Sequence, residues 1–284
     1  MQQIKKLLVC IMLLAMLGCL SVAAQSLKGD VNGDNRVDIG DVVTILEIIA
    51  NGGSAETSKA PAGVEAIDLG LPSGTLWANM NVGAEKPEDY GLYFAWGETT
   101  GYTSDTSDGR SFDWASYKWM AEGQSSWKYI NKYQIDDGQT EGCWYQYLYL
   151  LPEIEFVGDR KTVLDAEDDA AAANWGGRWV MPTYEEITEL LDNTEKEWNT
   201  INGVNGLKFK SKVNGKSIFL PASGYRTNDK LETKVTGGNY WSASLSTAWS
   251  AEAYRLVFNS KGVDTENNSY FRYGGRTVRP VIRK

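Results

Sequence analysis

Short β-prone runs, each ended by a Gly or Asn turn, follow one another from Val64 to the C-terminus and constrain the fold more than any other feature. They are EAIDLG, TLWANMNVG, GLYFAWG, GLKFK, KSIFLPASGYR, GNYWSAS, EAYRLVFN and RTVRPVIR. Runs of this length are typical of strands, and Asn214-Gly215 is a favourable hairpin turn between two of them. We therefore expect an irregular, loop-rich β architecture over residues 64–284.

Two helices are expected between these runs. The first covers Ala166–Asn174, with Asp165 as its N-cap. The second covers Tyr184–Asp192, where Thr183 caps the helix and Glu186 completes a capping box. Strands combined with two helices indicate the α+β class.

A twelve-residue acidic segment near the start has oxygen-bearing side chains at positions 1, 3, 5, 9 and 12, which is the spacing of a calcium loop. Because Ca²⁺ takes six to eight oxygen ligands, we expect it to be held by these side chains and one backbone carbonyl. The expected ligands are Asp30, Asn32, Asp34, Asp38, Asp41 and the carbonyl of Arg36. Apolar residues at helical spacing follow, at Val42, Ile45, Leu46 and Ile49.

The string GDVNGDNRVDIGDVVTILEII resembles one repeat of a type I dockerin, which implies a calcium-binding loop-helix over residues 25–52 and a cohesin-like partner. The chain departs from that family in two ways. It has one repeat where the family has two, and Asn35 stands where the family has Gly. Asn tolerates a left-handed backbone, so this change affects metal binding less than it affects docking.

Residues 53–63 are small and polar and include Pro61, which indicates a linker. Beyond it, residues 64–284 resemble the Fibrobacter succinogenes major paralogous domain in several blocks that occur in the expected order. These are DLGLPSGTLWANMNVGA, YGLYFAWGET, DAEDDAAAANWGGRWVMPTYEEITELL, SIFLPASGYR, NYWSAS and TVRPV. The resemblance implies a C-type-lectin-like fold, with irregular antiparallel sheets, two helices and long loops.

The block GRWVMPTYEEITEL is also similar to an element of formylglycine-generating enzymes, a catalytic branch of that fold. That branch needs a reactive cysteine pair. A chain cut after Ala24 keeps only Cys143, so the activity is not carried over. As a lone cysteine, Cys143 is expected to be buried.

The first 24 residues have the layout of a secretory signal peptide, with Lys5 and Lys6, an apolar run and small residues before a cut after Ala24. The segment Met16–Cys19 resembles a lipobox, so a lipid anchor at Cys19 is an alternative to free secretion. No later segment is apolar enough for a transmembrane span. The protein is therefore expected to be exported, either secreted or on the outer surface.

Composition removes several classes of function. The net charge of −9 becomes −11 without the two leader lysines, which disfavours a nucleic-acid partner. The chain has no histidine, so the usual zinc ligand and the commonest general base are absent.

The aromatic residues are the candidates for ligand binding, since flat rings stack on sugar faces. Five tryptophans inside the family blocks are expected in the core: Trp77, Trp96, Trp175, Trp179 and Trp241. Four others lie in the Ser- and Gly-rich stretch between blocks and are the ligand-binding candidates: Trp114, Trp119, Trp127 and Trp144. Their alternative role is to hold a long loop in place.

Charged clusters are ambiguous in the sequence. Asp165, Glu167, Asp168 and Asp169 are expected to form an acidic first helical turn, and no catalytic residue is assigned. Five arginines form either a positive pocket for an acidic sugar or salt bridges on strand surfaces: Arg226, Arg255, Arg272, Arg276 and Arg279.

These observations predict an exported calcium-binding protein with a noncatalytic domain that binds a glycan or a surface protein, linked to polysaccharide utilisation. Two alternatives stay open. One is an accessory polysaccharide-degrading enzyme, which would use paired carboxylates. The other is a structural surface or fimbrial component.

We predict that Asp34→Asn weakens Ca²⁺ binding about tenfold or more, because it removes one charged ligand from the loop. Arg36→Lys is the matched control, since only the backbone carbonyl of Arg36 is expected to bind the ion. Calorimetric titration of both variants measures the effect. If a chelator leaves amide exchange over residues 29–51 unchanged, the loop is not a metal site.

Overall fold

The computed structural model describes residues 37, 39, 42, 58–138, 140–148, 154–266 and 268–284. The chain divides into two compact units, Met1–Thr57 and Ser58–Lys284, and the division lies within the expected linker, 53–63. The six expected calcium ligands lie outside the described residues, as do the leader and Cys19. Of the amphipathic segment after the loop, Val42 is described and is helical.

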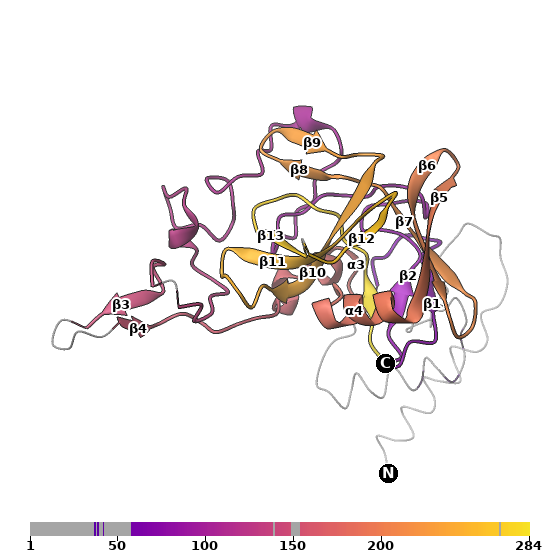
Figure 1. The fold of residues 1–284 in the computed structure, drawn as a ribbon, viewed down its shortest axis with the longest axis horizontal. Coiled ribbons are helices and arrows are strands. Elements are labelled where there is room, and N and C mark those ends of the chain that lie inside the picture. Colours follow the sequence, from indigo (N-terminus) through magenta and orange to yellow (C-terminus); the bar gives the residue numbers. More distant parts are fainter. Residues whose placement is uncertain are drawn as a thin grey trace, which may run out of the picture. The chain divides into compact units, whose positions relative to one another are not determined.

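The second unit is built from small antiparallel sheets (Figure 1). Strand β2 (Leu76–Ala78) pairs with β1 (Ala66–Asp68) on one side and with β14 (Val281–Ile282) on the other. This sheet joins the beginning of the unit to its end. Every pairing between the named strands of the described residues is antiparallel.

Two larger sheets carry most of the core. In one, β11 (Glu252–Asn259) pairs with β10 (Gly237–Leu245), β12 (Gly262–Asp264) and β13 (Ser269–Phe271). In the other, β6 (Val204–Ser211) lies between β5 (Thr194–Ile201) and β7 (Ser217–Pro221). The pairing of β6 with β7 confirms the hairpin expected at Asn214-Gly215. Two hairpins complete the set: β3 (Tyr145–Tyr147) with β4 (Ile154–Phe156), and β8 (Tyr225–Thr227) with β9 (Lys230–Glu232).

Helix α4 (Tyr184–Asn193) begins as predicted. The Thr183 hydroxyl accepts a hydrogen bond from the Glu186 N–H at 3.3 Å, and the Glu186 carboxylate accepts one from the Thr183 N–H at 2.7 Å. The expected helix over Ala166–Asn174 is wrong in one respect, because it is split. A 3₁₀ turn, η3 (Ala166–Asp168), comes first, and α3 (Ala170–Trp175) follows with Asp169, not Asp165, as its N-cap. Asp169 accepts from the N–H groups of Ala171 and Ala172, which fixes the helix start there.

Two of the four apolar clusters among the described residues include side chains of both β10 and β11. One of these two is formed with α3, and the other with α4, β6 and β7. The five tryptophans expected in the core are all buried, which confirms that prediction: Trp77, Trp96, Trp175, Trp179 and Trp241. Cys143 contradicts its expectation, because it is exposed next to Trp144, which takes the inward position.

Strand β5 was not expected from the sequence. It begins directly after α4 and is largely polar, since its outer face is exposed. Asn202 and Gly203 close the β5–β6 hairpin with φ of 49° and 83°, the left-handed backbone that a two-residue turn of this kind requires.

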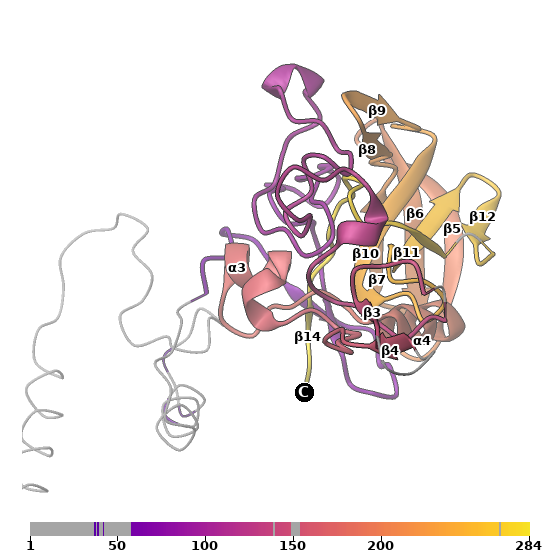
Figure 2. The same cartoon turned by 90° about the vertical axis from the view of Figure 1, so that its left-hand side faces the viewer.

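A long stretch of the second unit has little regular structure. Residues 97–165, called the loop segment below, contain η1 (Thr106–Asp108), η2 (Trp127–Tyr129) and the β3–β4 hairpin. In Figure 2 much of this stretch, coloured purple to magenta, faces the viewer, and Figure 1 shows its β3–β4 hairpin on the side away from β5 and β6. The β3–β4 hairpin projects from the rest of the unit (Figure 1).

Among the described residues, no helix has the length and apolar character needed to cross a membrane.

We predict that Thr183→Ala lowers the free energy of unfolding by about 1 kcal/mol, because it removes the side-chain half of the capping box. Thr188→Ala is the matched control within the same helix. The Thr188 hydroxyl only bonds back to the Tyr184 carbonyl, so this change is expected to be neutral. Thermal unfolding measures both, and equal losses would show that the cap contributes nothing specific.

Candidate functional site

The four candidate tryptophans all contact other aromatic rings. Trp144 is 2% exposed and packs beside Trp127, at 6.0 Å between ring centroids. Trp127 in turn meets Trp249 edge to face at 5.1 Å. The indole N–H of Trp144 is buried without a hydrogen-bond partner, so its ring serves packing.

Trp114 and Trp119 hold another part of the loop segment. The Trp114 ring lies 4.8 Å from that of Tyr273, and the Trp119 indole N–H donates to the Gly97 carbonyl at 3.2 Å. The side chains of Trp114, Trp119 and Trp127 are half-buried. Through these contacts the four tryptophans hold the loop segment in place. This is the alternative role that the sequence offered for them.

Among the described residues, the most exposed large aromatic side chain lies elsewhere. Tyr147 on β3 is 68% exposed and Ile154, its partner on β4, is 39% exposed. The sequence interpretation missed Tyr147. The strand alternation could have found it, since Trp144 faces inward and Tyr147 lies an odd number of residues away.

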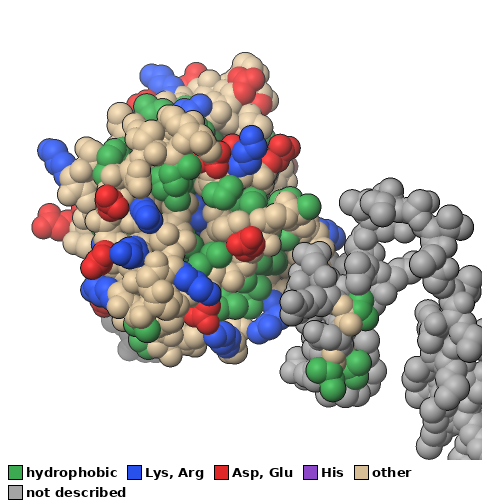
Figure 3. Space-filling model, turned by 90° about the vertical axis from the view of Figure 1, so that its right-hand side faces the viewer, with side chains coloured by type: hydrophobic (Ala, Val, Ile, Leu, Met, Phe, Trp, Pro, Cys, Tyr) green, Lys and Arg blue, Asp and Glu red, His purple; other side chains and the backbone are tan. Residues whose placement is uncertain are grey.

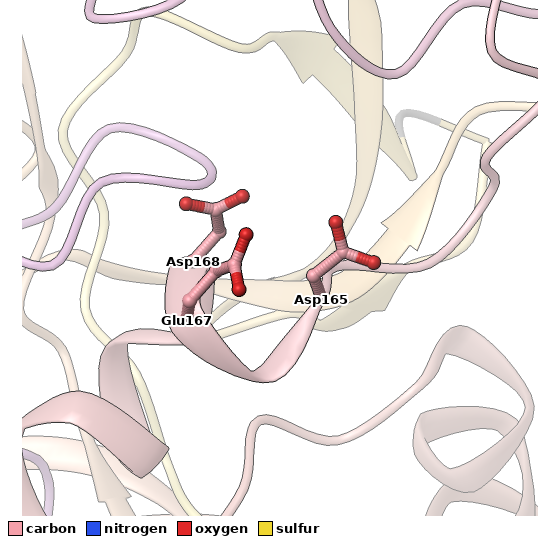
Figure 4. A group of neighbouring side chains, drawn as sticks. All are labelled: Asp165, Glu167 and Asp168. Atoms are coloured by element: carbon pink, nitrogen blue, oxygen red, sulfur yellow. The ribbon is translucent and has the colours of Figure 1, made fainter.

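The acidic residues around η3 are brought together. Asp165, Glu167 and Asp168 offer carboxylate oxygens within 4.8 Å of one another. Figure 4 shows the three groups pointing to the same side of the turn. Such a group of oxygens is a donor set that hard cations accept.

An ammonium group already lies among these carboxylates. Lys132 Nζ is 2.8 Å from Asp165, 3.5 Å from Glu167 and 2.6 Å from Asp168. Lys161 also pairs with Asp165, and Lys118 with Asp168. The cluster is therefore neutralised by this chain's own lysines, which accounts for it without a metal.

Asp168 is the centre of this network. It is 2% exposed and also accepts a hydrogen bond from the Tyr133 hydroxyl at 2.6 Å. Burial alone would raise its pKa, but the hydrogen bonds from Lys132, Tyr133 and Lys118 outweigh burial and lower the pKa. The hydrogen bond from Lys132, followed by that from Lys161, lowers the pKa of Asp165 to about 2. Both groups are held as carboxylates at neutral pH, so neither suits a general acid.

A second carboxylate in the loop segment is also paired. Both carboxylate oxygens of Glu98 accept from one nitrogen of Arg110, Nη2, at 2.9 and 3.0 Å, and Glu98 Oε1 also accepts from the Lys118 N–H. Together with the Asp168 network, this contact fixes the loop segment against η3. Lys118 belongs to both networks.

The five arginines contradict the expectation of salt bridges on strand surfaces, because their side chains are almost fully buried. Arg226, Arg272, Arg276 and Arg279 are at most 1% exposed and Arg255 is 9% exposed. Among the described residues, only Arg226 of these five has a carboxylate partner, Asp108, at 2.6 Å.

Arg272 and Arg279 are satisfied by oxygen atoms inside the unit. Arg272 donates to the carbonyls of Lys132, Tyr133 and Ser250 and to the Tyr117 hydroxyl. Arg279 donates to Asn81 and to the carbonyls of Ala78 and Phe219. Their role is to join segments that are far apart in the sequence.

Charges of both signs are interspersed on the face drawn in Figure 3. Basic side chains on that face alternate with acidic ones instead of forming a continuous positive surface. A polyanion meets no basic stripe there.

The chain matches no family model, no curated protein and no solved structure in the comparisons made with known proteins.

We predict that the Asp165 network loses its contribution to stability at low pH. The folded pKa of Asp165 lies below its unfolded value, so its contribution is complete above about pH 5 and disappears as pH falls toward about 2. Asp165→Asn should lower the melting temperature at pH 7, and its difference from wild type should shrink between pH 4 and pH 2. Glu167→Gln is the matched control, because Glu167 is exposed and 3.5 Å from Lys132. A difference independent of pH would contradict the ion-pair interpretation.

Proposed function

We propose that this protein is an exported, calcium-binding, noncatalytic binding protein whose second unit recognises a glycan. The observation that carries the proposal is the loop segment, a long stretch with little regular structure that is nevertheless held in place by aromatic anchors and ion pairs. Loops positioned by a rigid scaffold are the usual carriers of recognition.

The architecture supports the fold named from the sequence blocks only at the coarse level. Antiparallel strands with α3 and α4 are in keeping with an α+β domain of C-type-lectin-like type. The resemblance to the Fibrobacter succinogenes major paralogous domain, and that of residues 25–52 to a dockerin repeat, are parts of this proposal.

The paired carboxylates favour binding over catalysis. Glycosidases need one carboxyl group that can be protonated near its working pH and a second that stays ionised. The pKa of Asp165 in the loop segment and that of Asp168 on η3 are both lowered by hydrogen bonds from lysines, and Glu98 is held by Arg110. Neither of the two aspartates fits the role of an acid.

Protein binding is the second candidate, and the β3–β4 hairpin favours it. A two-stranded hairpin that projects and exposes Tyr147 and Ile154 offers an apolar surface to a protein partner. A structural surface component would use such a contact for assembly. Concentration-dependent association that Tyr147→Ser abolishes would favour this candidate.

We predict that residues 25–284 bind members of a broad glycan array, and that a chain lacking residues 25–57 binds the same members. Ca²⁺ is expected to change the stability of the first unit and to leave glycan binding by the second unit unchanged. Binding that disappears with residues 25–57 would contradict the assignment to the second unit. Absence of binding to every glycan would favour the protein-binding candidate.

A further inference from the structure

Arg276 is a buried charge without a hydrogen-bond partner. Its side chain is 0% exposed, and its Nε and both Nη atoms make no hydrogen bond among the described residues. The guanidinium lies 4.4 Å from the ring centre of Trp241, 4.4 Å from Tyr270 and 5.4 Å from Tyr225. Aromatic faces stabilise the cation, but they leave its N–H groups unsatisfied.

Neighbouring arginines show how different this environment is. Arg272, four residues earlier, donates to four oxygen atoms, and Arg279, three residues later, donates to three. The same C-terminal stretch thus has two buried guanidinium groups with an acceptor at every nitrogen and a third with none at any nitrogen among the described residues. A buried charge without a compensating partner is strongly destabilising.

A second guanidinium shares this environment. Arg255 on β11 lies 4.8 Å from the ring of Tyr270 and donates one hydrogen bond, to Asn239 at 2.7 Å. Its Nε is also buried without a partner. Among the described residues, neither Arg255 nor Arg276 has a carboxylate within 4.0 Å. Burial, and next the charge of Arg255, lowers the pKa of Arg276, as expected where a cation lacks an anion.

The rings over this pair come from short strands. Tyr225 lies on β8 and Tyr270 on β13, each strand having three residues, and both side chains are half-buried. The two rings are 6.4 Å apart and inclined at 49°. Both rings contact Arg276, and the Tyr270 ring also contacts Arg255.

We propose that the Arg255–Arg276 pair binds the carboxylate of an acidic sugar, which enters between Tyr225 and Tyr270. Guanidinium groups match a planar carboxylate with two parallel hydrogen bonds, and the tyrosine rings provide faces for the pyranose. This inference rests on the proposed glycan-binding function and names the class of glycan, one that carries uronic acid.

The first test is thermal unfolding of residues 25–284 with sodium glucuronate, glucose, or sodium chloride at equal ionic strength. Glucuronate should raise the melting temperature of the wild type, since a ligand that binds only the folded state stabilises it. Glucose and chloride should not. If sulfate or phosphate stabilises as much as glucuronate, the pair is a general anion site and the assignment to uronic acid is wrong.

The second test uses Arg276→Met, which keeps the length of the side chain and removes the charge. Without ligand, its melting temperature should equal or exceed that of the wild type, because an uncompensated buried charge is lost. Its affinity for an oligogalacturonate, measured by calorimetry, should fall more than about tenfold. Arg178→Met, at an exposed arginine, is the matched control and should change neither quantity.

Arg255→Gln keeps the proposal testable if Arg276→Met does not fold, and it should also weaken binding of the oligogalacturonate. Unchanged affinity in a folded variant of Arg276 or Arg255 would overturn the proposal. The proposal would also be overturned if Arg276→Met folds but is destabilised as strongly as Arg272→Met. That result would give the Arg276 guanidinium a structural role alone. Binding of neutral glycans without uronates would overturn this inference and leave the proposed function standing.

Discussion

The arrangement of the second unit depends most on the hydrogen bonds that the Arg272 guanidinium donates. It donates to the carbonyls of Lys132 and Tyr133 in the loop segment and to that of Ser250 just before β11. The ring of Trp96 lies 4.8 Å from its centre, and the Tyr117 hydroxyl accepts from its Nε. A single buried cation therefore joins a stretch with little regular structure to the sheet of β10 and β11.

The reason for a charged group in that position is geometric. A loop turns its carbonyl groups in several directions, and buried carbonyls must find donors. Arginine offers five N–H donors in a fixed plane, so it satisfies several carbonyls at once where a helix or sheet cannot form. Arg226 and Arg279 act similarly, because each contacts segments more than a hundred residues away in the sequence. Arg276 differs, because its N–H groups have no acceptor among the described residues. The inferred anion site rests on this difference.

The sequence predicted features whose signal is local. The capping box at Thr183 and Glu186, the β6–β7 hairpin and the burial of the block tryptophans depend on neighbouring residues or on hydrophobicity, and all are confirmed. Strand β5 was missed because its residues are mostly polar, and its place is set by pairing with β6. The split at Asp169 was missed because Asp165 was taken as the cap of one continuous helix, whereas Asp165 precedes a 3₁₀ turn and Asp169 caps α3.

The environment of the charged residues could not be predicted, since it depends on contacts distant in sequence. Nothing near Arg272 or Arg279 indicates that their partners lie in the loop segment or on β7. Similarly, Lys132 and Asp168 are 36 residues apart, so no motif reveals their ion pair. Spacing revealed the acidic cluster, whereas only the fold revealed that lysines fill it.

Hydrogen exchange of Arg272→Met tests most directly whether this guanidinium holds the loop segment. The account predicts that amides over residues 117–135 lose protection while those of β5, β6 and β7 keep it. The reason is that the apolar cluster formed with α4, β6 and β7 packs independently of Arg272. Unchanged exchange over residues 117–135, or an equal loss throughout the second unit, would contradict it.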